Sequence, residues 1–216
     1  MIALKIALTC VISYLLGSLN FSIICSKLFK KDDVRGHGSG NAGITNYLRN
    51  YGGLSTLIVM VGDMGKCVAA VLVGQYIFRG DMIAGYDIAD AMKFLAGFFV
   101  MLGHMFPLYF GFKGGKGVLS TAALILAFDW RMFLIGISIF IIIVVITRYV
   151  SLGSVIAIWS VLPQVWLFYR EAPLVWVYML IYAAIGALVT IRHSSNIVRL
   201  IHHNESKFSF GHKNGK

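Results

Sequence analysis

Long apolar segments separated by short polar ones dominate the chain. Seven segments are almost entirely apolar, and they cover residues 2–29, 53–78, 88–105, 118–128, 132–147, 151–168 and 173–191. A helix needs roughly 20 mostly apolar residues to cross a bilayer, with about 17 to 25 usual. The pattern predicts an all-α, polytopic membrane protein with about seven transmembrane helices. The segment 118–128 is too short to cross the membrane by itself, unless the glycine-rich turn before it lies partly within the membrane.

The composition agrees with a membrane protein. The 216 residues are 58% hydrophobic and 13% charged, and the mean hydropathy is +0.80, which is too apolar for the surface of a soluble domain. The formal charge of +10 would suggest nucleic acid as a partner of a soluble protein. In a membrane protein it indicates basic cytoplasmic loops instead, so we expect no nucleic-acid partner. Cys10, Cys25 and Cys67 lie in apolar stretches without metal-ligand spacing, and we interpret them as core residues.

The distribution of basic residues predicts the orientation. With seven spans and the N-terminus outside, the outer side receives Lys5, Arg79, Lys93, Arg131 and Arg170, and only Lys66 lies within a span. The remaining thirteen of the 19 Lys and Arg residues then share the side of the C-terminus, which the positive-inside rule assigns to the cytoplasm. Three polar loops, at 30–52, 103–118 and 191–207, fall on that side. We expect one membrane-integral domain over 1–216, with an acidic outer segment at 81–90 that forms a solvated loop or a short interfacial helix.

The first polar loop contains the stretch DVRGHGSGNAGITNYLRNYG, residues 33–52. Glycines at alternate positions let backbone N–H groups point toward a bound anion. Arg49 can bind a phosphate through two parallel hydrogen bonds. The groups that could hold a phosphate beside Arg49 are Ser39, Gly40, Asn41, Thr45 and Asn46. The alternative is a flexible turn between two spans, although a simple turn does not require so many amide and hydroxyl groups.

The second loop contains GHMFPLYFGFKGGKGV, residues 103–118. A nucleotide-binding P-loop would read G-x-x-x-x-G-K-[ST], but Phe110 and Gly117 break that pattern and no strand precedes it. The stretch still has the properties of an anion site, with open N–H groups, two cations and a helix N-terminus near Val118. Its candidate binding residues are Lys113, Gly114, Gly115, Lys116 and Gly117. His104 is more often a packing or capping residue at such a helix end than a catalyst.

The third loop contains IRHSSNIVRLIHHNESK, residues 191–207. His193, Asn196 and Arg199 recur every third residue and could share one face of a short helix. Glu205 is the only acid on this side after Asp33, which suggests an orienting salt bridge with one of the many cations. A basic tail that touches anionic lipid would explain the lysines near the C-terminus, but it would not explain the pairing of a histidine with an asparagine.

The second apolar segment contains two opposite charges. Asp63 and Lys66 are three residues apart, so they share one helix face and can pair within the membrane. Charges inside a membrane are costly and usually functional. A structural pair that fixes the helix bundle is an equally good interpretation of this spacing.

Together these stretches resemble the bacterial acyl-phosphate:glycerol-3-phosphate acyltransferase family. The matching patterns are D-x-R-x-x-G-S-G-N-x-G-x-T-N-x-x-R at 33–49, D-x-x-K at 63–66, G-H-x-F-P at 103–107, F-K-G-G-K-G-V at 112–118 and R-H-x-x-N-I-x-R-L at 192–200, followed by Glu205. The resemblance extends over the whole chain. Positions that depart from the family pattern lie beside the polar groups rather than at them: Asn20, Ile44, Cys67, Leu119 and His203–Asn204. They bear on packing and substrate preference.

The resemblance implies a reaction and its partners. A fatty acyl group passes from acyl phosphate to the 1-hydroxyl of glycerol 3-phosphate, which gives lysophosphatidate and phosphate, the first committed step of phospholipid synthesis. Such an enzyme lies in the bacterial plasma membrane, has its active site on the cytoplasmic face and needs no cofactor or metal. The alternative is a small transporter or binding protein for a phosphorylated solute. Transporters usually show repeats and midplane sites, and the polar motifs here gather on one face.

The mechanism expected from these residues is direct attack of the glycerol hydroxyl on the acyl carbonyl. Acyl phosphate is already activated, and the chain has no G-x-S-x-G elbow for a covalent nucleophile. The predicted catalytic residues are Ser39, Arg49, Lys116, His193 and Asn196. His193 is a candidate general base, although the leaving phosphate could accept the proton itself. Asp63, Lys66, His104, Arg199 and Glu205 are predicted to support or orient the site.

Overall fold

The structure, a computed structural model, describes residues 1–208 and is almost entirely helical. The N-terminal half contains α1 (Ile2–Ser18), α2 (Phe21–Lys30), the short 3-10 helix η1 (Val34–Gly36), α3 (Ile44–Tyr51), α4 (Gly53–Ile77), β1 (Met82–Ile83), β2 (Tyr86–Asp87) and α5 (Ala89–Met105). The C-terminal half contains the 3-10 helix η2 (Leu108–Phe110), α6 (Val118–Phe128), α7 (Trp130–Thr147), α8 (Val150–Trp159), α9 (Val161–Tyr169), α10 (Val175–Arg192) and α11 (Ser194–Ile201).

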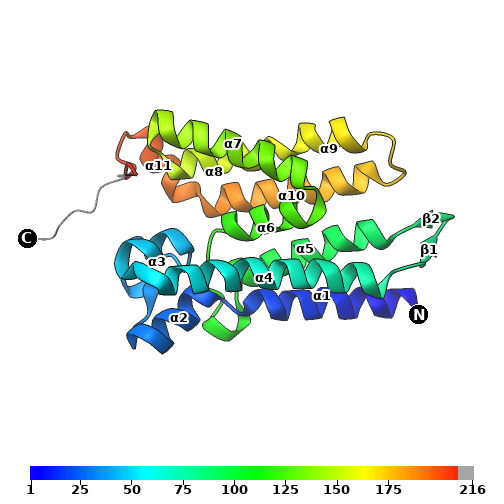
Figure 1. The fold of residues 1–216 in the computed structure, drawn as a ribbon, viewed down its shortest axis with the longest axis horizontal. Helices are drawn as coiled ribbons and strands as arrows, with labels where there is room; N and C mark the ends of the chain where they lie inside the picture. The colour runs from blue at the N-terminus through cyan, green and yellow to red at the C-terminus, as the bar shows by residue number, and fades with distance from the viewer. Residues whose placement is uncertain (209–216) are drawn as a thin grey trace, which may run out of the picture.

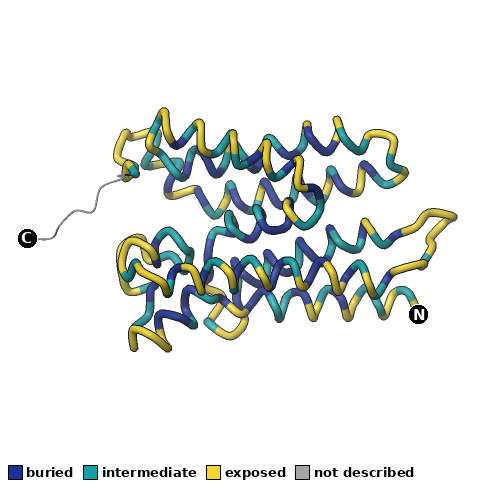
Figure 2. The backbone as a smooth tube through the Cα atoms, viewed as in Figure 1, coloured by how far each residue is buried: buried dark blue, intermediate teal, exposed yellow. Residues whose placement is uncertain are grey.

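Six helical stretches among the described residues are long and apolar enough to cross a membrane. They begin at Ile2, Gly53, Ala89, Trp130, Val150 and Val175. The seventh predicted segment is α6, a helix of only 11 residues. Large apolar side chains such as Val61, Ile146 and Leu180 are exposed, where a soluble protein would carry polar groups. Exposed positions recur along the helices of both layers (Figure 2). These features confirm the prediction of an all-helical polytopic membrane protein.

The helices form two layers with α6 between them (Figure 1). The helices α1, α4 and α5 form one layer, and α7, α8, α9 and α10 form the other. The first layer is tightly packed because glycines replace side chains at its contacts. A Cβ added at Gly17 would clash with the backbone of Val100, and one at Gly103 would clash with the carbonyl oxygen of Tyr14. Small residues at such crossings let two membrane helices approach closely, and this approach positions the end of α5 beside α1.

The first predicted span is not continuous, which corrects the expectation of one helix over 2–29. The chain leaves the helix at Leu19–Asn20, and α2 begins again at Phe21. Asn20 caps α2 by accepting a hydrogen bond from the N–H of Ile23, and its side chain also donates to the carbonyl of Ala42. The break therefore has its own polar side chain, which ties it to the first polar loop.

The sixth predicted span is broken as well, between α8 and α9 at Ser160. Pro163 explains this break, because its ring would clash with the carbonyl of Trp159 and it has no N–H to donate. The segment 81–90, which the sequence predicted as a solvated loop or a short interfacial helix on the outer side, is neither a plain loop nor an interfacial helix. It forms a small exposed hairpin in which Met82 pairs with Asp87 and Ile83 with Tyr86.

The polar loops gather at one end of the bundle. The helices α2, α3 and α11 lie at this same end, whereas the N-terminus and the β1–β2 hairpin lie at the opposite end (Figure 1). We call this end of the bundle the loop end. It brings together residues from all three polar loops that the sequence singled out.

Candidate active site

A cavity of about 1110 Å³ opens at the loop end between the two layers. Every one of the three polar loops contributes to its lining. The predicted residues that line it are Ser39, Gly40, Asn41, Thr45, Asn46, Arg49, Asp63, His104, Lys116, Gly117, His193, Asn196, Arg199 and Glu205. Lys66, Lys113, Gly114 and Gly115 do not line it. The loops are far apart in sequence, and their common cavity makes them one candidate site.

One chain of hydrogen bonds connects the second loop with the third. Lys116 donates to the side-chain oxygen of Asn196, and the Asn196 amide donates to Glu205 at 2.7 Å. Arg199 forms an ion pair with the other carboxylate oxygen of Glu205 at 2.8 Å, as the isolation of that acid predicted. Ser151 on α8 donates a further hydrogen bond to Glu205. The carboxylate thus fixes the amide that contacts Lys116.

The charge of Lys116 is sensitive to this environment. Burial lowers its pKa to about 8. The negative charge of Glu205 acts in the opposite direction, and the nearby cations Arg199, Arg192 and Arg49 lower the pKa further. These four cations converge on the same region, so the cavity is electropositive and suited to bind anions.

His193 is buried at the end of α10, with its side chain in the cavity lining. Its Nδ1 lies 2.8 Å from the carbonyl oxygen of Val189, an atom that can only accept a hydrogen bond. The hydrogen of a neutral ring therefore belongs on Nδ1, and Nε2 keeps its lone pair. Burial lowers the pKa of His193, which favours the neutral ring. The residue is thus held in the form that a general base requires.

Arg49 lies on α3, and it is exposed at the cavity. Within residues 1–208 its side chain has no hydrogen bond or ion pair to another residue. Its guanidinium group is therefore available to a ligand. Ser39, Asn41 and Thr45 line the same side of the cavity and add hydroxyl and amide donors.

Asn46 has a different role from its neighbours. Its side-chain oxygen accepts from the backbone N–H of Ser39 at 3.0 Å, and its side-chain nitrogen donates to the carbonyls of Val34 and His37. These contacts use the amide to shape the glycine-rich turn around Ser39. Asn46 lines the cavity, but the contacts of its side chain support the loop.

The glycine-rich turn before α6 differs from the prediction of open N–H groups. Gly114 and Gly115 donate their N–H groups to the carbonyls of Met105 and His104. A Cβ at Gly114 would clash with the His104 carbonyl, and one at Gly115 would clash with the His104 ring. These glycines permit close packing rather than phosphate binding. Lys113 is exposed outside the cavity, so Lys116 is the lysine of this turn that faces the site.

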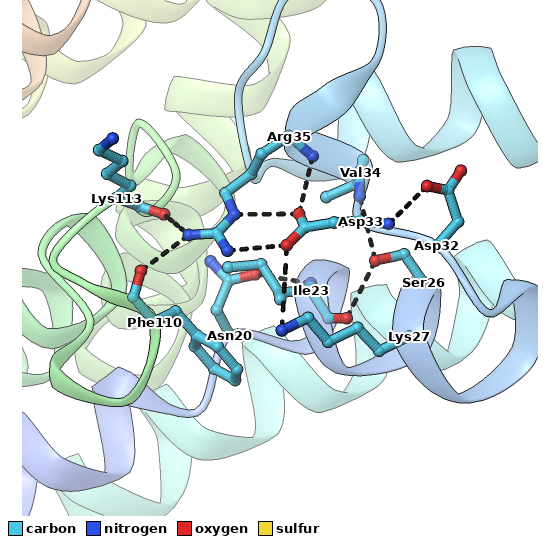
Figure 3. Close-up of polar contacts among 10 residues, drawn as sticks. All are labelled: Asn20, Ile23, Ser26, Lys27, Asp32, Asp33, Val34, Arg35, Phe110 and Lys113. Carbon is cyan, nitrogen blue, oxygen red and sulfur yellow. Dashed lines mark hydrogen bonds and ion pairs between the residues drawn. The ribbon is translucent and has the colours of Figure 1, made fainter.

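Two arginines that the sequence did not single out hold the loops in place. Arg35 pairs with Asp33, at 2.9 Å from Nε and 2.7 Å from its terminal nitrogen, and donates to the carbonyl of Phe110 at 2.7 Å (Figure 3). These bonds lower the pKa of Asp33. Arg192 donates to the carbonyls of Gly114 and Gly115. The D-x-R pattern at 33–35 was the available signal for Arg35, whereas nothing local to Arg192 indicated its distant partners.

Asp63 and Lys66 form the predicted pair inside the bundle. Their charged groups are 2.7 Å apart, and both side chains are almost completely buried. Lys66 also donates to the carbonyls of Gly17 and Leu19, the groups that the break between α1 and α2 leaves without helical partners. His104 lies 3.2 Å from Lys66. The cluster therefore supports the broken span, and Asp63 and His104 also form part of the cavity wall.

The half of the cavity farther from the loops is apolar. It lies between α6, α7 and α8, and it is lined by Leu119, Ala122, Ile125, Phe133, Ile137, Phe140, Ala157 and Ile158. We call this half the apolar arm. An electropositive mouth and an apolar arm within one cavity fit a ligand with an anionic head and a hydrocarbon tail. The fold and the site thus define a polytopic membrane protein with a cavity whose lining matches an amphiphilic anion.

Comparisons with known proteins identify the family. The sequence model of the glycerol-3-phosphate acyltransferase family matches residues 7–203. A glycerol-3-phosphate acyltransferase of Shouchella clausii is 38% identical over 206 residues, which cover 94% of this chain and 96% of that protein. One from Prochlorococcus marinus strain MIT 9215 is 36% identical over 197 residues, covering 91% and 94%.

Solved structures give the same assignment. The crystal structure of PlsY (YgiH), an integral membrane glycerol 3-phosphate acyltransferase in its glycerol 3-phosphate form, superimposes with a TM-score of 0.81 at 33% identity. The match covers 94% of this chain and 96% of that one. The lysophosphatidic acid form of PlsY gives a TM-score of 0.79 at 32% identity. This chain belongs to the family of membrane-integral glycerol-3-phosphate acyltransferases and is an enzyme of that class.

Proposed function

We propose that this protein transfers a fatty acyl group from acyl phosphate to the 1-hydroxyl of glycerol 3-phosphate and releases lysophosphatidate and phosphate. The observation that carries the proposal is the division of one cavity into a cationic mouth and an apolar arm. Both substrates bear a phosphate, and the donor also has a long hydrocarbon tail. The family supports the acceptor, and the architecture of the cavity supports an amphiphilic donor.

The reaction needs no enzyme-bound acyl intermediate. The hydroxyl oxygen of the acceptor attacks the acyl carbonyl carbon, a new ester bond forms, and the bond between the acyl carbon and the phosphate oxygen breaks. The phosphate leaves with both electrons of that bond. The hydroxyl proton passes to Nε2 of His193, whose lone pair the Val189 contact leaves free, or to the departing phosphate.

The proposed roles follow the positions of the cations. Ser39, Asn41 and Lys116 hold one phosphate, and Arg49 with Thr45 holds the other. The Asn196 amide donates to Glu205 while its oxygen accepts from Lys116, so these two contacts hold Lys116 in place beside the substrate. Preorganised donors of this kind stabilise charge that develops on the carbonyl oxygen and the leaving group.

The proposed location is the plasma membrane of a bacterium, with the loop end in the cytoplasm and the N-terminus outside. The bias of basic residues toward the loops at 30–52 and 191–207 supports this orientation. It also gives the site access to soluble glycerol 3-phosphate, while the apolar arm lies at the depth of the lipid tails.

A phosphate-release assay tests the donor and the acceptor together. Protein purified in detergent should release phosphate from palmitoyl phosphate only when glycerol 3-phosphate is present, with one lysophosphatidate formed for each phosphate. Palmitoyl-CoA in place of palmitoyl phosphate should give no product. Equal rates with palmitoyl-CoA would reject acyl phosphate as the specific donor. Binding of glycerol 3-phosphate without any acyl transfer would favour the transporter alternative.

A further inference from the structure

One glycine in the wall of the apolar arm has no packing reason to be a glycine. Gly136 is buried in the middle of α7 and lines the cavity. A Cβ built on it would meet no other heavy atom within 4 Å, apart from its chain neighbours and its own helix backbone. By contrast, a Cβ at the buried glycines Gly17, Gly97 or Gly153 would press into a neighbouring helix. The space beside Gly136 is therefore the cavity itself.

The neighbours of Gly136 on α7 show how far this open space extends. Phe133, Gly136, Ile137 and Phe140 follow the helical spacing of one face of α7, and all four line the cavity. An aromatic side chain thus stands at each end of the stretch with the glycine between them. At about 1.5 Å per residue the stretch is about 10 Å long. A glycine inside a helix is less stable than an alanine. At position 136 this cost is offset by the open space that the missing side chain leaves in the cavity.

The direction of the passage follows from α8. Ser151 at the start of α8 binds Glu205 in the polar part of the site, and Ala157 and Ile158 line the cavity about two turns further along. On the antiparallel α7, Phe140 lies toward the polar part and Phe133 lies toward the far end. An acyl tail that enters from the phosphate site therefore passes Phe140, then Gly136, and ends near Phe133.

We propose that Gly136 is a specificity-determining residue that sets how long an acyl chain the enzyme accepts. The inference rests on the proposed acyl transfer. A side chain at position 136 would fill the arm partway along its length. Short acyl chains would end before the obstruction, whereas long chains would lose burial beyond it. Each methylene group of the acyl chain that is excluded from the apolar arm lowers the affinity about fourfold.

The test compares palmitoyl phosphate with octanoyl phosphate as donors for the wild type, Gly136→Ala and Gly136→Leu. The quantity compared is the ratio of kcat/KM for the two donors, since the fraction of folded enzyme affects both values equally and cancels. Gly136→Leu should lower the palmitoyl-to-octanoyl ratio by at least about tenfold, and Gly136→Ala should lower it by less. The glycine-to-leucine change at Gly65, which is exposed and also open around its Cβ, should leave the ratio unchanged.

A second control lies on α7 itself. Ser138 is exposed on the side away from the cavity, so Ser138→Leu should leave the ratio unchanged. The proposal is overturned if the wild type is active but both Gly136 variants keep its palmitoyl-to-octanoyl ratio. It is equally overturned if Gly65→Leu lowers the ratio as much as Gly136→Leu. A wild type that transfers neither chain would instead overturn the proposed function, so the two failures are distinguishable.

Discussion

Lys116 and Asn196 lie 80 positions apart in sequence, yet Nζ of the lysine is 2.5 Å from the side-chain oxygen of the asparagine. This bond joins the turn before α6 to α11. An ammonium group has three donors, and only one of them is used here, so two remain for a substrate anion. The same lysine is mostly shielded from water and lies near other cations, and both features lower the pKa of its ammonium group.

The first prediction concerns the pH dependence of activity. Because the pKa of Lys116 is lowered to about 8, the free enzyme keeps its charge below that pH and loses it as the pH rises further. We expect kcat/KM for glycerol 3-phosphate to fall above about pH 8. Lys116→Arg should shift this alkaline limb to higher pH, since arginine stays charged, and Lys116→Ala should cost about ten- to a hundredfold. An unchanged alkaline limb in Lys116→Arg would show that another group titrates.

A second prediction separates the charge of Glu205 from its hydrogen bonds. Glu205→Gln should lower kcat because Arg199 loses its ion pair, and the neutral amide offers one acceptor oxygen to Asn196 and Arg199 where the carboxylate offers two. The negative charge of Glu205 raises the pKa of Lys116, so its removal should also shift the alkaline limb to lower pH. Ser151→Ala removes one hydrogen bond but keeps the charge. It should therefore cost less activity and leave the alkaline limb in place; a limb that moves equally in both variants would contradict the electrostatic explanation.

The third prediction contrasts two arginines of the first loop. Arg35 is paired with Asp33 and with carbonyls of the second loop, whereas Arg49 has no partner in residues 1–208. Arg35→Ala should lower the free energy of unfolding by about 1.5–3 kcal/mol, since it removes charge-assisted hydrogen bonds. Arg49→Ala should leave the unfolding temperature unchanged and raise KM for a phosphate substrate. Thermal unfolding in detergent and steady-state kinetics measure the two effects, and a stability loss in Arg49→Ala would reject the distinction.

These loops show which features local sequence could predict. Long apolar runs predict membrane helices because the hydrophobic pattern can be read from neighbouring residues alone. The three polar loops were recognisable in the same way, by their glycines, amides and cations. An ion pair of Glu205 was also predictable, since only one acid lay near so many cations, but the sequence did not single out Arg199 as its partner. The roles of Gly114 and Gly115 were not, because the His104 carbonyl and ring that exclude a side chain belong to another segment.

The departures from the family pattern also show that local sequence does not reveal contacts between distant segments. Ile44 and Leu119 line the cavity, so their side chains border the space around a substrate. Asn20 caps α2, and its side chain also donates a hydrogen bond to the carbonyl of Ala42. A sequence can show that a residue is unusual, but the partner that explains Asn20 lies 22 positions away. Only the folded chain shows that contact.

The fourth prediction concerns the buried Asp63–Lys66 pair. Asp63→Asn leaves the Lys66 ammonium buried without its counter-charge, and the free energy of unfolding should fall by about 3–5 kcal/mol. Lys66→Met should be at least as damaging, because it also removes the donor to the carbonyls of Gly17 and Leu19. The double variant restores electrical neutrality but leaves those two carbonyls without Lys66.

Thermal unfolding of both single variants and the double variant distinguishes two roles for this pair. The double variant should be more stable than the sum of the single losses predicts, since the charge imbalance is gone. It should still remain below the wild type, because the break between α1 and α2 has lost its donor. Full recovery would mean that Lys66 serves only to neutralise Asp63. Strict additivity would mean that the two charges do not interact.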